Sequence, residues 1–309
     1  MAGDEHGDQP RDHVPGVDAE TTEIATEGLR RMVAATARIF EAASLEYAQV
    51  QRASENIIRT FAEQVAPILE RFEQHDVRSI AASLSVVVDQ LAKYLPPNWR
   101  GAEIPDLRDV QHIAEEERIA FVHVPRASIV TLLLAAPDAP TRRALLEEHA
   151  DSIALDCAEI AATMSTPRGR EYGRFLALSV DALRAGHTAA SQALSTNLVD
   201  TLGGTYITPE TFGHRWKVLV GKNLRTKVLA QTLRTSLVLL PLSAAYTSYD
   251  PGAEIPEEFS RHATSHGVSA RQYNRANAVL SLMSAASLLR WLEDDRAAFD
   301  EPELAPDEA

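Results

Sequence analysis

Apolar and small residues return every third or fourth position along most of this chain, which is the spacing of helices that bury one face. The longest such pattern covers residues 24–75, and a second covers 77–94 and ends before Pro96-Pro97. Pro67 lacks the N–H group of an internal helix bond, so we expect a kink there. The pattern predicts a long helix packed antiparallel on a shorter one.

Two arrangements bury the apolar seam of this N-terminal extension, 24–97. In the first, the two helices form a hairpin within one chain. In the second, the seam pairs with another chain as a coiled coil, because its spacing is close to a heptad. The same seam offers a binding surface for a partner protein.

The next segment, 98–139, is predicted to be a connector. Asp106 is a suitable N-cap for a short helix that ends near Arg118. The run 119–124, Ile-Ala-Phe-Val-His-Val, is short, aromatic and β-branched, and Pro125 closes it, so it is the best strand candidate in the chain. A single strand is not stable alone, so this run either pairs with another strand or is an extended linker.

Helical spacing returns after the connector, and Pro and Gly residues interrupt it. Because Pro241 lacks the N–H group of an internal helix bond, the pattern does not define where the helix predicted at 211–245 ends. We therefore expect an all-α protein in which 140–292 forms a helical bundle, with one short strand near 119–124 as the exception. The predicted helices cover 127–135, 140–164, 169–185, 188–202, 211–245 and 272–293.

The charge of the chain is concentrated at its two ends. The net charge is −14, of which residues 1–23 hold −6 and residues 293–309 hold −7, so 24–292 is close to neutral. Neither end has an apolar face to bury, so we expect both to be disordered acidic tails. The alternative is that an acidic tail occupies a basic site of its own protein.

Cysteine content and hydropathy point to the cytoplasm. The single cysteine, Cys157, excludes an intramolecular disulfide and favours a reducing compartment. Ile153 and Ile160 share its helix face, so we expect a core side chain rather than a nucleophile. No run of about 18 apolar residues exists, and the polar start 1–15 does not resemble a signal peptide. We expect no contact with a membrane.

Several kinds of site are excluded by their missing motifs. The sequence has no phosphate-binding glycine loop, no dinucleotide fingerprint, no nucleophile elbow and no cysteine pair for zinc. His262 and His266 are four residues apart, but no third ligand accompanies them. We expect neither a cofactor nor a bound metal.

One segment, 214–234, contains basic residues and no acid. Ordinary helices mix the two signs, so this segment is a candidate for contact with phosphates, and RNA is the expected partner. The alternative is a solvated face of an amphipathic helix. The candidate RNA-binding residues are Arg215, Lys217, Lys222, Arg225 and Lys227.

The strongest candidate for chemistry is the segment 259–267, Phe-Ser-Arg-His-Ala-Thr-Ser-His-Gly. Arg261 is a permanent cation that can hold a phosphate and stabilise charge on its oxygens. The imidazole of His266 can remove a proton from a ribose 2′-hydroxyl or donate one to a leaving oxygen. These are the groups that a metal-independent ribonuclease requires.

This segment resembles the C-terminal signature of the HEPN-like domains, in which an R-x4-6-H motif stands at the last helices. Arg261 and His266 match the ends of the motif, and His262 stands where the family often has Asn or another polar residue. The resemblance covers at most about 140–292. It implies an all-helical metal-independent endoribonuclease of a toxin or defence system that dimerises with two motifs face to face. Arg261 would then hold phosphate, His266 would be the general acid or base, and His262 an accessory donor.

The competing interpretation is a non-catalytic scaffold or interaction protein. In it, Gly267 ends a helix after His266, and Arg261 forms a structural ion pair with Glu257 or Glu258.

Overall fold

The computed structural model describes residues 95–104, 106–209, 215, 216, 228, 232–247, 249, 250, 252 and 254–294. These residues form helices and loops and contain no β-strand. The all-α expectation therefore holds for this part of the chain. The tail 1–23, residues 24–94 of the extension and residues 295–309 lie outside it.

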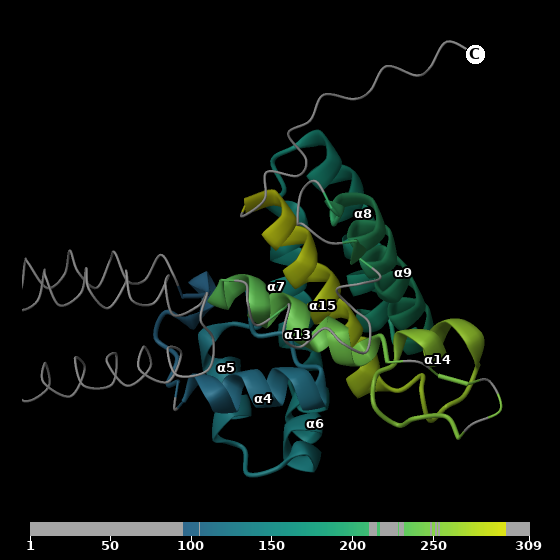
Figure 1. Ribbon diagram of the computed structural model, residues 1–309, viewed down its shortest axis with the longest axis horizontal. Helices are drawn as coiled ribbons and strands as arrows, with labels where there is room; N and C mark the ends of the chain where they lie inside the picture. Colours follow the sequence, from purple (N-terminus) through teal and green to yellow (C-terminus); the bar gives the residue numbers. More distant parts are fainter. Residues whose placement is uncertain are drawn as a thin grey trace, which may run out of the picture.

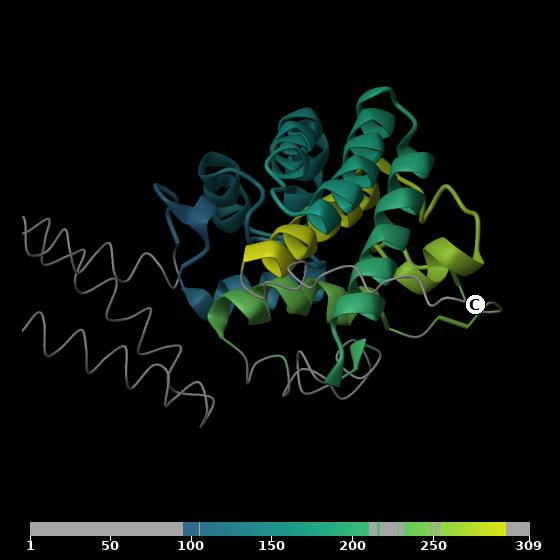
Figure 2. The same cartoon turned by 90° about the horizontal axis from the view of Figure 1, so that it is seen from above.

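A central helix, α15 (Arg275–Asp294), organises the bundle (Figure 1). Its side chains are buried around nearly the whole circumference from Ala276 to Leu292. A helix that is buried on all sides must be covered by several neighbours. Figure 2 shows α15 between α7 and α8 on one side and α13 on the other. The helices that cover α15 are α6 (Ala139–Glu148), α7 (Ala150–Ala162), α8 (Pro167–Arg184), α9 (Thr188–Tyr206) and α13 (Leu233–Ala245).

The connector packs against α13 through α4 (Leu107–Glu117). The Asp106 side chain accepts a hydrogen bond from the Arg108 N–H at 2.7 Å and caps this helix. Arg118 ends it in the left-handed conformation, with φ 61°. Both predicted ends of this helix are thus confirmed. A 3-10 turn, Pro97–Trp99, precedes α4, and α5 (Ala127–Ala135) lies later in the same connector segment.

The predicted strand at 119–124 is wrong. The segment is buried, but it runs as an irregular linker in which His123 has φ 66°. Its Phe121 carbonyl accepts hydrogen bonds from Trp99 Nε1 at 2.7 Å and Asn98 Nδ2 at 3.1 Å. Side chains thus satisfy this carbonyl in place of a neighbouring strand, which is how a buried non-helical segment remains stable.

Other boundaries differ from the predictions in smaller ways. The helix expected at 140–164 is two helices, because the chain turns at His149, which joins α6 to α7. Pro241 does not end α13, which continues to Ala245. α15 reaches Asp294, so the first two residues assigned to the C-terminal tail are helical.

Cys157 is fully buried, as expected for a core side chain, and burial raises the pKa of its thiol. Among the described residues, no helix is both long and apolar enough to cross a membrane.

His123 is a half-buried imidazole in the linker between α4 and α5. Its Nε2 atom has no hydrogen-bond partner among the described residues. Burial, and after it the positive charges of Arg234 and Arg290, lower its pKa to about 3. In the folded protein this side chain is therefore neutral at every pH above that value, whereas in the unfolded chain it takes up a proton near pH 6.5.

This difference predicts an acid-sensitive stability. The contribution of neutral His123 is fully present above about pH 6.5 and is lost as the pH falls, at about 1.4 kcal/mol per pH unit. Between about pH 6.5 and pH 5 the free energy of unfolding should fall by roughly 2 kcal/mol from this residue. His123→Asn should remove this contribution to the pH dependence of the free energy of unfolding, and asparagine tolerates the positive φ at this position. Denaturant titrations at several pH values measure it, and His112→Asn, at an exposed position of α4, is the control. Parallel curves for the wild type and His123→Asn would contradict the assignment.

Candidate functional site

The candidate residues lie on α14 (Arg261–His266), a short helix beside α9 (Figure 1). Ser260 begins it, because its Oγ accepts a hydrogen bond from the Ala263 N–H at 3.2 Å. Gly267 ends it, and its N–H donates to the Ala263 carbonyl at 3.0 Å. The helix is continuous from Arg261 to His266. Arg261 and His266 consequently stand at opposite ends of α14.

A buried glutamine holds the chain that leads into α14. The side chain of Gln272 is fully buried and makes three hydrogen bonds to the backbone of this loop. Its Nε2 donates to the carbonyls of Pro256 at 3.0 Å and Glu258 at 2.9 Å, and its Oε1 accepts from the Ser260 N–H at 2.8 Å. Because the amide uses both its donor and its acceptor, the start of α14 has one defined position.

Two further side chains bond the inner face of α14, and a third bonds the loops on either side of it. Gln192 of α9 donates from Nε2 to Thr264 Oγ1 at 3.0 Å and to the Gln272 carbonyl at 3.1 Å. The Tyr273 hydroxyl donates to the Thr264 carbonyl at 2.6 Å. Asn277 of α15 donates from Nδ2 to the Gln272 carbonyl at 2.8 Å and to the Glu257 carbonyl at 2.9 Å. With this face bonded to the bundle, the other face of α14 remains for contact with a ligand.

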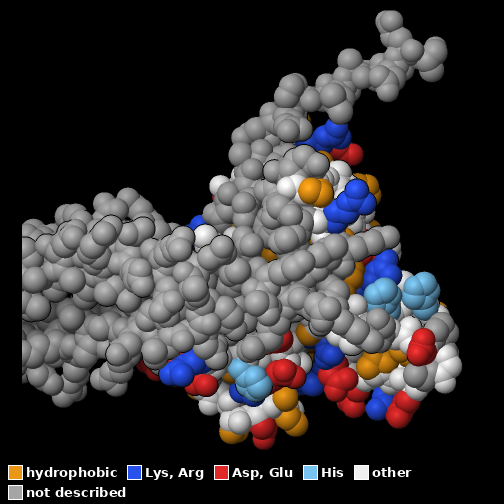
Figure 3. All heavy atoms as spheres, viewed as in Figure 1, with side chains coloured by type: hydrophobic (Ala, Val, Ile, Leu, Met, Phe, Trp, Pro, Cys, Tyr) orange, Lys and Arg blue, Asp and Glu red, His pale blue; other side chains and the backbone are white. Residues whose placement is uncertain are grey.

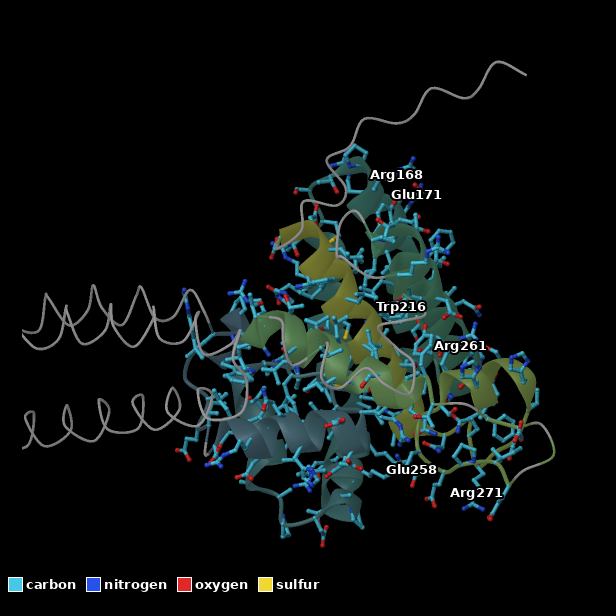
Figure 4. The ribbon with its side chains drawn as sticks, viewed as in Figure 1. Arg168, Glu171, Trp216, Glu258, Arg261 and Arg271 are labelled. Atoms are coloured by element: carbon cyan, nitrogen blue, oxygen red, sulfur yellow. The ribbon has the colours of Figure 1, made fainter. Side chains whose placement is uncertain are left out.

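Arg261 is oriented by Asp200 of α9. Its Nε donates to Asp200 Oδ2 at 2.7 Å, and its Nη2 donates to the same oxygen. The other oxygen, Oδ1, accepts a hydrogen bond from the Tyr246 hydroxyl, and the guanidinium carbon lies 5.8 Å from the centre of the Tyr246 ring. Arg261 therefore does not form the expected ion pair with Glu257 or Glu258. Figure 4 shows Arg261 on the side of the bundle near Trp216, with Glu258 well away from it.

The ion pair between Arg261 and Asp200 is partly exposed, since the exposed fractions of the two side chains are 24% and 22%. The hydrogen bond to Asp200 raises the pKa of Arg261 further above its ordinary value. Burial, and after it the Asp200 carboxylate, raise the pKa of Tyr246, so its hydroxyl remains protonated and donates. This arrangement fixes the guanidinium and leaves part of it open to solvent.

His262 connects Arg261 to His266. Its ring lies parallel to that of His266, with centroids 6.1 Å apart and an interplanar angle of 11°. Its Nδ1 lies 3.4 Å from Nη1 of Arg261. A guanidinium has no acceptor, so Nδ1 must accept in this contact, and a neutral imidazole then carries its proton on Nε2. Burial, followed by the charges of Arg261 and His266, lowers the pKa of His262 and favours this neutral form.

His266 is exposed, and His262 and Arg261 are partly exposed. Figure 3 shows two histidine side chains together at the surface over α14, with a basic side chain beside them. The structure thus places the three residues predicted for catalysis on one solvent-facing surface. We call Arg261, His262 and His266 the α14 cluster.

The predicted RNA-binding segment is described in part. Arg215 is exposed, whereas Lys217, Lys222, Arg225 and Lys227 lie outside the described residues. Next to Arg215, Trp216 is buried against α9, and its ring makes an edge contact with Tyr246 at a centroid distance of 5.2 Å. This segment therefore passes close to the residues that orient Arg261.

Sequence reasoning missed Asp200, Tyr246, Gln192 and Gln272 as parts of the site. Asp200 carries a signal in retrospect, because it is an acid within an otherwise apolar and small stretch, Leu198 to Gly204. Its link to Arg261 spans 61 residues, which local spacing does not reveal.

Comparisons with known proteins add no relative: no family model, curated protein or solved structure matches this chain. Within the described part of the chain, no group of three or more His, Cys, Asp or Glu residues is placed to hold a metal ion. The HEPN-like resemblance accordingly stays an expectation.

The contact between Trp216 and α9 gives a prediction with a built-in control. A Cβ at Gly203 would lie 2.3 Å from the Trp216 ring, whereas a Cβ at the neighbouring Gly204 meets nothing within 4 Å. Gly203→Ala should lower the free energy of unfolding by about 1–3 kcal/mol, because the tryptophan must move. Gly204→Ala should raise it by about 0.5–1 kcal/mol through helix propensity. Denaturant unfolding measures both, and equal effects of the two substitutions would show that Trp216 does not pack there.

Proposed function

We propose that this protein is an endoribonuclease that cleaves RNA without a metal ion, with the α14 cluster as its site. The observation that carries the proposal is the presentation of a guanidinium and two imidazoles on the outer face of one short helix. The hydrogen bonds of Gln272 and Asp200 hold these groups in position, and preorganised groups stabilise a transition state without further rearrangement.

The chemistry assigns a different task to each group. His266 accepts the proton of a ribose 2′-hydroxyl while the 2′-oxygen attacks the adjacent phosphorus. The bond from phosphorus to the 5′-oxygen breaks, and water supplies the proton that this oxygen needs. The products are a 2′,3′-cyclic phosphate and a 5′-hydroxyl end. Arg261 uses its open N–H groups to stabilise the phosphoryl oxygens, and His262 is an accessory donor beside them.

The wider RNA contact belongs to the same proposal. The exposed Arg215 lies next to Trp216, which contacts the Tyr246 that bonds Asp200. A basic segment starting there would extend the phosphate contacts of the α14 cluster along the strand. Pairing of two chains with their clusters face to face, as the resemblance implies, would place two such sites on one RNA.

A second candidate function, a non-catalytic scaffold, is favoured by one observation. Asp200 pairs with Arg261 and at the same time accepts a hydrogen bond from Tyr246, which is the geometry of a structural ion pair. A charge-neutral pair attracts phosphate less than a free cation does. Asp200→Asn distinguishes the two functions. It should change the rate of RNA cleavage if the protein is a ribonuclease, whereas a scaffold has no cleavage activity to change.

The test is cleavage of single-stranded RNA by the purified full chain in EDTA, followed by analysis of the new ends. His266→Ala should lower the cleavage rate at least about 100-fold, which is the usual contribution of a general acid or base. Arg261→Lys should lower it at least about tenfold, because an ammonium group does not hold phosphate with two parallel bonds. The cleaved ends should carry 2′,3′-cyclic phosphates, and an oligonucleotide without 2′-hydroxyls should remain intact.

His187→Ala is the matched control, since His187 is an exposed histidine just before α9 and should be silent. RNA left intact by the wild type would remove the ribonuclease proposal and leave the scaffold. Equal loss of activity in His187→Ala and His266→Ala would show that the α14 cluster is not the site.

A further inference from the structure

A hollow of about 620 Å³ lies between α7 and α8, at the end of the bundle where α8 begins. The α7 side is lined by three alanines, Ala158, Ala161 and Ala162, and Met164 lines the turn between the helices. At Gly173 the two backbones are close, since a Cβ there would lie 2.9 Å from the Ala161 carbonyl oxygen. The result is a shallow, mostly apolar groove between two helices.

Large apolar side chains extend this groove along the same helix faces. Leu155 is 48% exposed and lies three residues before Ala158, and Leu178 is 56% exposed and lies four residues after Arg174. Residues three or four apart share one face of a helix. The groove and these leucines together form an apolar surface that the described residues leave open, and such surfaces commonly receive a partner segment.

The rim of the groove carries two arginines and one glutamate. Arg170 and Arg174 line it on the α8 side and are exposed. Neither has a carboxylate partner among the described residues, since Arg170 donates only to the Ser165 carbonyl. Glu171 is bonded to Arg168, and Figure 4 shows this pair at the same end of α8. The groove therefore suits a segment that combines carboxylates with a few apolar side chains.

The chain contains such a segment directly after α15. Residues 295–309 hold six acids and one base, together with Phe299 and Leu304. α15 ends close to the groove, because the Glu293 carboxylate accepts hydrogen bonds from the Ser165 and Thr166 N–H groups at 2.8 and 2.7 Å, just before α8 begins. At about 3.3 Å per residue, the five residues from Asp294 to Phe299 span roughly 17 Å. A helix is roughly 10 Å in diameter, so this length is enough for the segment to pass around the start of α8 and reach the groove.

We propose that residues 295–309 dock in the α7–α8 groove, with their carboxylates at Arg170 and Arg174 and with Phe299 or Leu304 on the apolar floor. The inference does not rest on the ribonuclease proposal, because the groove and the α14 cluster involve different residues. Salt should weaken the docking, since the charges at the rim are exposed.

Disulfide trapping in the full chain tests the docking. One variant combines Ala162→Cys in the groove with Phe299→Cys in the segment. The control combines Phe299→Cys with Ala189→Cys, an exposed position near the opposite end of α8. The native Cys157 is fully buried and does not interfere. Under mild oxidation the first variant should form an intramolecular disulfide at least tenfold faster than the control.

Charge reversal gives the second readout. Arg174→Glu should slow the trapping severalfold, whereas Arg184→Glu, at an exposed position in the last turn of α8, should not. Equal trapping rates in the groove variant and the Ala189 control would overturn the proposal. Disulfide-linked dimers in place of the intramolecular bond would also overturn it and would assign the groove to a second copy of the chain.

Discussion

The position of α14 depends on one buried side chain, the amide of Gln272. A helix of six residues is too short to be stable by itself, so its position must come from tertiary contacts. Gln272 supplies them by bonding two carbonyls and one N–H of the loop that leads into α14. A buried backbone group that loses its partner costs about 1–3 kcal/mol, so any other position of this loop is disfavoured. Gln192 and Asn277 add bonds of the same kind from α9 and α15.

This constraint determines which side chains of α14 face solvent. Ala263 and Thr264 are buried against the bundle, so Arg261, His262 and His266 face outward or along its edge. Asp200 then limits what Arg261 can do, because it takes up two of the guanidinium's donor groups. The parallel ring of His262 brings a neutral donor beside His266. A charged residue fixed by its neighbour and an imidazole open to solvent are the combination that acid–base chemistry on a phosphodiester requires.

The sequence was sufficient where the deciding forces are local. Among the described residues, apolar spacing predicted most of the helices, and the short polar side chain of Asp106 predicted the start of α4. It failed at 119–124 because a buried linker has the composition of a strand, and the donors that satisfy it come from Asn98 and Trp99, 23 and 22 residues earlier. The nearest acids, Glu257 and Glu258, suggested the wrong partner for Arg261. The true partner lies on α9, and only the packing of the bundle brings the two together.

We propose that RNA binds at the α14 cluster, and the imidazole signals of the protein report on this binding most directly. Nuclear magnetic resonance spectra of the histidine rings can be recorded while a 2′-O-methyl RNA, which binds but is not cleaved, is added. We predict that the ring signals of His262 and His266 shift together and saturate, while the signal of the exposed His112 on α4 does not move. Saturable binding of the same RNA with both α14 signals unchanged would contradict it.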